Sequence, residues 1–240
     1  MTIPVRTTID SIDARWSIQT TDDGSCTLID RVSGDSMHSG CGALAETEHV
    51  YLQNSGVKTR LEQGLATRVL EVGLGTGLAC LLTCAAADHH QTKLDYVALE
   101  IAITPMAVIE QLGFERYVNG KLLDAYLELL RQSADQPMVI GNVGDHCRVS
   151  IHQSDAARWS REDDHDFNAI YFDPFSPQTN PELWSERVLA TMRGRLCVDG
   201  KLVSYCVSRQ VRDRLAAAGF RVQRVPGPIG GKREVLVAAV

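Results

Sequence analysis

The chain has 240 residues, of which 44% are hydrophobic and 22% charged, as in an ordinary soluble globular protein. No stretch approaches the roughly 20 apolar residues of a membrane span, and the N-terminus lacks the apolar core of a secretory signal, so we expect a cytoplasmic protein without a membrane partner. The net charge of −6 argues against a surface coated with nucleic acid. Residues 181–240 nevertheless carry 11 basic and 5 acidic side chains, a balance of +6 that leaves −12 for residues 1–180.

Residues 1–60 are predicted to form an N-terminal extension. Two segments of alternating polarity, residues 16–20 and 26–29, flank the turn residues 22–25 and predict a β-hairpin. Residues 43–52 have helical periodicity. We expect this hairpin and helix to cover a cleft in the domain that follows.

Strands and helices alternate over residues 61–240, which indicates a doubly wound α/β sheet. We predict seven strands in a mostly parallel, Rossmann-like sheet. The last strand is antiparallel, because its connection is too short for a parallel crossover. Residues 115–146, which include an amphipathic stretch, look inserted. The predicted strands are 69–72, 94–99, 147–152, 167–172, 200–206, 220–225 and 234–240, and the predicted helices are 76–87, one from about 105, 182–196 and 211–218.

The seven cysteines are scattered, odd in number and without a C-x-x-C pair. Cys80 and Cys84 lie one helical turn apart among alanines and leucines, which favours core packing over metal binding. We therefore expect reduced thiols and no metal site.

The glycine-rich stretch Val69–Gly77 joins the first core strand to the first helix. Its spacing, with Gly73, Gly75 and Gly77 at alternate positions, differs from the G-x-G-x-x-G of dinucleotide sites, which disfavours NAD. With Glu71 before it, the stretch resembles motif I of class I S-adenosylmethionine (SAM) methyltransferases. That resemblance implies that Glu71, the three glycines and Thr76 bind SAM; a tight turn without a ligand is the alternative.

Acidic residues follow the second and third core strands, at the sheet edge where α/β proteins bind ligands. Glu100 could accept hydrogen bonds from a ribose diol, and Asp155 from the adenine amino group or a backbone amide. Glu71 or Glu46 could meet the methionine ammonium group. Each acid taken alone could equally be a surface carboxylate.

The turn Asp173-Pro174-Phe175 follows the fourth core strand and predicts the acceptor side of the site. Aromatic faces stack on nucleobases, and a carboxylate can orient an amine and accept its proton. Asp173 and Phe175 are thus the predicted catalytic residues, with Pro174 stiffening the turn on the substrate-binding side. Alternatively, Asp173 caps the turn and Phe175 packs against the sheet.

A set of short stretches, spread over nearly the whole chain except about residues 103–150, matches the pattern of one family. The matching stretches are Asp23–Ser25 with Thr27-Leu28, His38-Ser39, Gly42-Ala43, Glu46, Leu70–Leu78, Leu99-Glu100, Asp173–Pro177, Asn180–Trp184, Ala218–Phe220 and Gly230–Glu234. In these stretches the sequence resembles the bacterial tRNA 5-methylaminomethyl-2-thiouridine methyltransferases, that is, the MnmC methyltransferase domain and its MnmD relatives.

This resemblance implies SAM-dependent N-methylation of the aminomethyl group on a modified wobble uridine in the tRNA anticodon loop. It places Lys232 and Arg233 near the mouth of the active site, and gives the basic C-terminal quarter a use in contacting the tRNA backbone. Separate enzymes would supply the aminomethyl precursor.

Two positions depart from the family pattern. Met37 stands where tyrosine is usual, and Arg209 where glycine is usual. The acceptor could therefore be a different amine or nucleobase. A SAM-binding or RNA-binding module without turnover, and an aminopropyl-transferring relative, are further alternatives.

Overall fold

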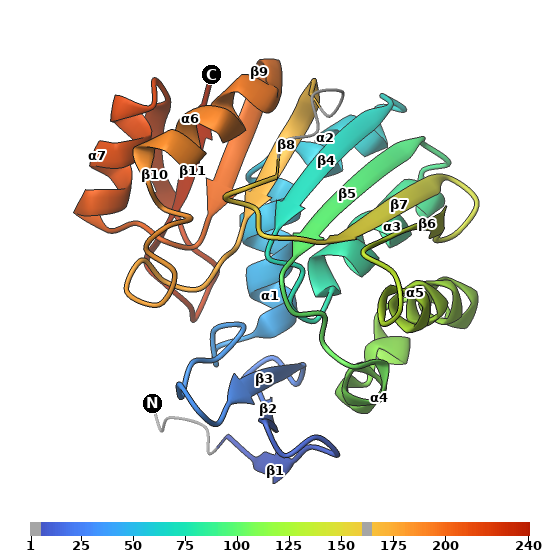
Figure 1. Ribbon diagram of the computed structural model, residues 1–240. Helices are drawn as coiled ribbons and strands as arrows, with labels where there is room; N and C mark the ends of the chain where they lie inside the picture. The colour runs from blue at the N-terminus through green and yellow to red at the C-terminus, as the bar shows by residue number, and fades with distance from the viewer. Residues whose placement is uncertain (1–5, 160–164) are drawn as a thin grey trace.

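The computed structural model describes residues 6–159 and 165–240. The described chain forms a large central sheet with helices on both faces and a small N-terminal sheet (Figure 1). The N-terminal sheet lies beyond one end of the central strands, at the bottom of the view. Residues 1–5 of the predicted N-terminal extension lie outside the described residues.

The small sheet contains the predicted hairpin and one further strand. Strands β2 (Trp16–Thr20) and β3 (Cys26–Asp30) are antiparallel, and β1 (Thr8–Asp10) pairs with β2. Trp16, Ile18 and Leu28 are buried, so one face of this sheet packs against the rest of the protein.

The central sheet has the order β10-β11-β9-β8-β4-β5-β7-β6. Its middle strands are parallel, and the antiparallel pairs lie at its two ends. The parallel strands are nearly continuous runs of apolar residues, as expected where helices cover both faces. The strands are β4 (Thr67–Val72), β5 (Leu94–Glu100), β6 (Met138–Asn142), β7 (Cys147–Gln153), β8 (Phe167–Phe172), β9 (Leu196–Ser204), β10 (Arg221–Pro226) and β11 (Glu234–Ala239).

Two hydrophobic clusters lie on opposite faces of the central sheet. Val69 of β4 belongs to the cluster that includes α2, α3 and α5, whereas the next residue, Leu70, belongs to the cluster that includes α6 and α7. The helices are α1 (Ala43–Glu46), η1 (Thr47–Gln53), α2 (Val57–Glu62), α3 (Leu78–His89), α4 (Met106–Ile109), η2 (Glu110–Leu112), η3 (Phe114–Arg116), α5 (Gly120–Ser133), α6 (Glu186–Arg195) and α7 (Arg209–Ala217).

The predicted doubly wound α/β fold with an antiparallel C-terminal strand and an N-terminal hairpin and helix is confirmed. The central sheet has one strand more than predicted. Among the described residues this strand, β6, pairs with β7 alone, at the edge of the sheet, and it falls within the segment predicted to be an insertion. The division into 1–60 and 61–240 stays a prediction, and its boundary falls inside α2.

The predicted helix over residues 43–52 continues beyond α1 as a π-helix, η1, which is uncommon and frequently occurs at functional sites. The helix predicted from residue 182 begins four residues later, because the side chain of Ser185 accepts a hydrogen bond from the Val188 amide and caps α6. None of the described helices has the length and apolar character that crossing a membrane requires.

Candidate active site

A cavity of about 660 Å³ lies at the carboxyl ends of β4, β5, β7 and β8. Its walls come from the loops that follow these strands, from α1 and η1, and from the small N-terminal sheet. Ligands of open α/β sheets bind at this end of the strands. The cavity therefore lies where the sequence predicts the active site.

The glycine-rich loop forms one wall of the cavity. Gly73 has φ +90°, and a Cβ atom there would lie 2.7 Å from the backbone oxygen of Asp173. Only glycine lets the loop after β4 approach the loop after β8 this closely. Gly77, at the start of α3, does not line the cavity. It is needed for packing instead, because a side chain there would collide with the ring of Tyr126 from α5.

Glu100 and Asp155 line the same cavity from the ends of β5 and β7. Glu100 accepts hydrogen bonds from the Gly75 amide (3.2 Å) and the Ala102 amide (3.0 Å), so its carboxylate is fixed against the glycine-rich loop. Asp155 accepts one from the Ala157 amide at 2.9 Å. Burial raises the pKa of Glu100, which these backbone donors partly offset.

Glu71 lies on β4 beneath the glycine-rich loop and is 2% exposed. Its Oε2 accepts a hydrogen bond of 2.9 Å from the Tyr96 hydroxyl. Burial raises the pKa of Glu71 well above its usual range. Because Glu71 also lines the cavity, a cationic group there would favour its ionised form.

The turn Asp173-Pro174-Phe175 forms the adjoining part of the wall and is held by two side chains. The indole N–H of Trp184 donates to the Phe175 oxygen at 2.9 Å, and the Tyr205 hydroxyl donates to the Pro174 oxygen at 3.0 Å. Trp184 is fully buried and packs edge-on against Phe172. The turn is thus anchored to the core, which fixes the direction of Asp173.

Charged and hydroxyl groups surround the Asp173 carboxyl. Burial and the nearby Glu46 raise its pKa well above the usual range, whereas a hydrogen bond from Tyr51 and the charge of Lys232 lower it. Glu46 is 5% exposed, and its own pKa is raised by burial. Lys232 Nζ lies 3.9 Å from Glu46 Oε1.

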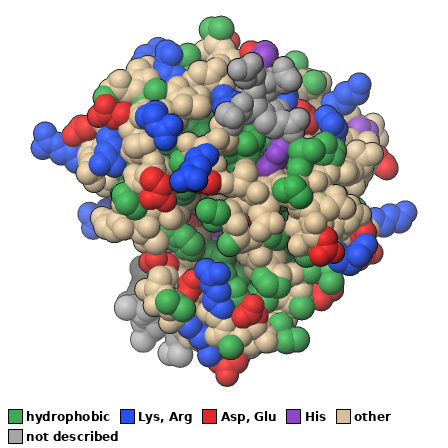
Figure 2. Space-filling view, in the orientation of Figure 1, with side chains coloured by type: hydrophobic (Ala, Val, Ile, Leu, Met, Phe, Trp, Pro, Cys, Tyr) green, Lys and Arg blue, Asp and Glu red, His purple; other side chains and the backbone are tan. Residues whose placement is uncertain are grey.

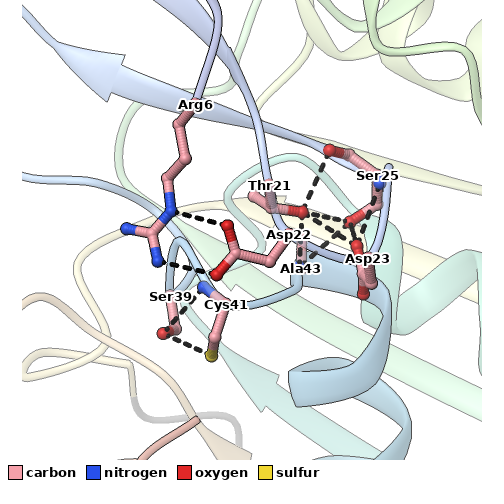
Figure 3. Close-up of polar contacts among 8 residues, drawn as sticks. All are labelled: Arg6, Thr21, Asp22, Asp23, Ser25, Ser39, Cys41 and Ala43. Carbon is pink, nitrogen blue, oxygen red and sulfur yellow. Dashed lines mark hydrogen bonds and ion pairs between the residues drawn. The ribbon is translucent and has the colours of Figure 1, made fainter. Parts of the chain in front are cut away.

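The hairpin turn of the small sheet positions Glu46. Polar side chains of this turn gather at the start of α1, beside Ala43 (Figure 3). The first amides of α1 have no capping side chain of their own helix. Instead, Ser25 Oγ accepts from the Ala43 and Leu44 amides at 3.0 and 3.1 Å, and Asp23 accepts from the Ala45 amide at 2.9 Å. The hairpin turn therefore caps α1 from outside the helix and aims its last residue, Glu46, into the cavity.

The structure brings most of the predicted site residues together. The predicted residues that line the cavity are Glu46, Glu71, Gly73, Gly75, Thr76, Glu100, Asp155, Asp173, Pro174, Phe175 and Lys232. Gly77 and Arg233 are not among the lining residues. Arg233 instead contributes its backbone oxygen to a turn with the Gly227 amide.

Sequence reasoning missed several residues of this site. Tyr51 and Tyr205 carry no functional signal in the sequence, because tyrosines at helical and strand spacing are indistinguishable from core residues. His38 also lines the cavity, and burial lowers its pKa to about 4, so it is neutral near pH 7. In the described part of the chain, no three His, Cys, Asp or Glu side chains are placed to hold a metal ion.

A protein-family model matches half of the chain. A family model described as "S-adenosyl-L-methionine-dependent methyltransferase" matches residues 120–240. That range includes the Asp173 turn and Lys232, and excludes the glycine-rich loop.

Curated relatives are tRNA 5-methylaminomethyl-2-thiouridine biosynthesis bifunctional proteins, MnmC. The chain is 29% identical to that of Azoarcus sp. (strain BH72) over 85% of its own length and 32% of the relative's. It is 32% identical to that of Delftia acidovorans over 81% of its own length and 30% of the relative's. The chain thus spans about a third of the length of the curated relatives that it matches.

Solved structures share the fold. The crystal structure of MNMC2 from Aquifex aeolicus superposes with a TM-score of 0.72 at 24% identity, covering 93% of this chain and 69% of that chain. Spermidine synthase from Thermotoga maritima has a TM-score of 0.52 at 17% identity, covering 97% and 72%.

Proposed function

Because the chain belongs to the S-adenosyl-L-methionine-dependent methyltransferase family, we propose that it methylates the aminomethyl nitrogen of a modified wobble uridine in tRNA. The MnmC relatives support this acceptor, since their name refers to 5-methylaminomethyl-2-thiouridine in tRNA. The single observation that carries the proposal is the close approach of Gly73 to Asp173, which joins the predicted donor loop to the predicted acceptor turn in one cavity.

The cavity fits the cofactor that this family uses. Two buried hydroxyls on its wall, Thr76 Oγ1 and Ser154 Oγ, have no hydrogen-bond partner among the described residues, which is costly unless a ligand bonds to them. Glu71 and Glu100 supply carboxylates for cationic and hydroxyl groups. When bound, SAM supplies an electrophilic methyl group on a sulfonium.

Asp173 is the proposed proton acceptor. A primary amine is mostly protonated near pH 7 and has to lose a proton before its lone pair can attack a methyl group. Burial and Glu46 raise the pKa of Asp173, which makes its carboxylate a stronger base than an exposed aspartate. Phe175 lies beside Asp173 on the cavity wall, where its ring is available to stack on the base.

A second candidate is methylation of a different amine or nucleobase. Met37, where the family usually has tyrosine, lines the cavity, and so this departure bears directly on the acceptor. Arg209, the other departure, begins α7 with a side chain that is 88% exposed and lies near Asp213. It is not among the lining residues.

The two candidates differ in which nucleoside receives the methyl group. We expect that protein incubated with methyl-labelled SAM and bulk tRNA from cells lacking this methylation puts the label into one anticodon nucleoside, the methylaminomethyl uridine. The same tRNA already methylated at that position is the control and should take up no label. Label in any other nucleoside, or only in small amines, favours the second candidate.

The proposed acceptor implies partners. We propose that other enzymes attach the aminomethyl group to the uridine before this protein methylates it. We also propose that the protein acts in the cytoplasm and that it needs no metal ion.

A further inference from the structure

An ammonium group already sits in the acceptor half of the cavity. Nζ of Lys232 lies 3.9 Å from Glu46 Oε1 and 3.9 Å from the centroid of the Tyr205 ring. Its charge also acts on the Asp173 carboxylate. Carboxylates together with an aromatic face are the groups by which proteins hold alkylammonium ions.

The groups around this ammonium are held in place independently of Lys232. Glu46 accepts a hydrogen bond from the Ser39 amide at 2.5 Å, Tyr205 bonds to the backbone of Pro174, and Asp173 is bonded by Tyr51. Glu46 belongs to α1, Tyr205 follows β9 and Asp173 follows β8, so none of them lies in the loop that carries Lys232.

Lys232 differs from them in exposure. Its side chain is 42% exposed, whereas that of Glu46 is 7% exposed. Lys232 lies in the loop between β10 and β11, so its ammonium reaches into the cavity from a solvent-facing stem. It can therefore leave without unpacking the core.

The two carboxylates at this place favour a cation. Burial raises the pKa of both Asp173 and Glu46, the nearby Glu46 raises that of Asp173 further, and the positive charge of Lys232 lowers both. Thr47, next to Glu46, is fully buried and lines the cavity, and its hydroxyl lacks a partner among the described residues. An incoming polar group could bond to it.

We propose, building on the proposed function, that Glu46, Asp173 and the Tyr205 ring form an ammonium seat for the acceptor amine, and that Lys232 fills this seat until the amine displaces it. The side chain of Lys232 and an aminomethyl group both end in a primary alkylammonium, which is why one can replace the other. This assigns Glu46 to the acceptor, where sequence reasoning placed it with the cofactor. The titratable groups that face Asp173 are Glu46, Tyr51, Glu71, Tyr205 and Lys232.

Binding of ethylammonium chloride, measured by calorimetry on the full chain without tRNA, tests the seat. Lys232→Met removes a tethered competitor, so we expect it to bind ethylammonium about tenfold more tightly than the unmodified chain. Ethylammonium should also release protons at pH 6 in Lys232→Met, seen as a binding enthalpy that changes with the buffer. Lys121→Met, a change at an exposed residue of α5, is the matched control and should leave binding unchanged, as should sodium chloride.

Adding Glu46→Gln to Lys232→Met should weaken ethylammonium binding about tenfold. If Lys232→Met folds poorly, Lys232→Gln replaces it, because glutamine also removes the ammonium group. Equal binding by the unmodified chain and both Lys232 variants, or no effect of Glu46→Gln, overturns the proposal. If ethylammonium binds as expected but no tRNA is methylated, the seat stands and the proposed acceptor is wrong.

Discussion

At the scale of single residues, the site works by placing ionisable groups where burial changes their chemistry. Asp173 lies at the cavity wall with a raised pKa, and Tyr51, Glu46 and Lys232 each shift that pKa in a known direction. The position of a group relative to its neighbours therefore decides its role more than its residue type does.

Replacing Asp173 by Asn should remove the proton acceptor and keep the shape of the turn. We expect the rate of methyl transfer at saturating substrate to fall by about 100-fold or more, the usual contribution of a general base. Equilibrium dialysis with labelled SAM should give a dissociation constant within a few-fold of the original. Unchanged turnover in this variant would show that Asp173 does not accept the proton.

Tyr51→Phe tests the hydrogen bond that stabilises ionised Asp173. Because this bond lowers the pKa of Asp173, its loss should raise that pKa further. The base works only when ionised, so the acidic limb of the pH–rate profile should move to higher pH. Tyr171→Phe is the matched control, since the Tyr171 hydroxyl lies 3.4 Å from Thr83 Oγ1 in the core; its profile should keep its position. A Tyr51→Phe limb that stays in place, or moves to lower pH, contradicts this account.

Sequence alone predicts the residues whose chemistry shows in a local pattern. Glu100 and Asp173 are predictable because each stands at the carboxyl end of a predicted strand. Tyr51 and Tyr205 act on the site through partners more than 30 positions away in the sequence, and no local pattern marks such contacts. Glu46, Lys232 and Asp173 are all predicted from the sequence, but their proximity to one another is evident only in the folded chain.

At the scale of elements, the cavity depends on how loops meet. The loops after β4 and β8 touch through Gly73, and the β2–β3 turn caps α1. Strand positions and the hairpin follow from alternation and turn residues in the sequence. The edge strand β6 and the π-helical form of η1 do not, because both depend on contacts made with other elements.

Gly73→Ala tests the approach of the two loops. Its φ of +90° alone should cost about 1–2 kcal/mol of unfolding free energy, and the 2.7 Å contact with the Asp173 oxygen should add to that and weaken SAM binding. Gly64 is the matched control, with φ +70° and no atom within 4 Å of the added Cβ. We expect Gly64→Ala to lose only the unfolding free energy that its backbone conformation accounts for, as measured by urea unfolding. Its affinity for SAM, measured by dialysis, should be unchanged. Equal losses in both variants would mean that the loop contact is unimportant.

At the scale of the whole molecule, charge is unevenly divided along the chain. Residues 181–240 carry +6 on a protein of net charge −6. On the face seen in Figure 2 basic and acidic side chains are interspersed, so a polyanion would need selected basic groups rather than a uniform surface. Exposed arginines of the C-terminal quarter, such as Arg209, are candidates for phosphate contacts.

Arg209→Glu should weaken tRNA binding and make it less dependent on salt. Each phosphate contact contributes about 0.7–0.9 to the slope of log affinity against log salt, so the slope should become shallower by about that amount. Arg131→Glu changes an exposed arginine of α5, outside the basic quarter, and serves as the control. Fluorescence anisotropy with labelled tRNA from low to moderate salt gives both slopes. Identical slopes for the two variants would place the tRNA elsewhere.

The most direct test of the account is the mass of the wobble nucleoside after reaction. The substrate is a tRNA whose wobble uridine carries an unmethylated aminomethyl group, and the protein is supplied with SAM alone. We predict that nucleoside mass spectrometry finds one added methyl on the side-chain nitrogen, and that Asp173→Asn, folded and able to bind SAM, leaves this nucleoside unchanged. An unmodified wobble nucleoside with the original protein, or a methyl group on another atom, would contradict the central claim.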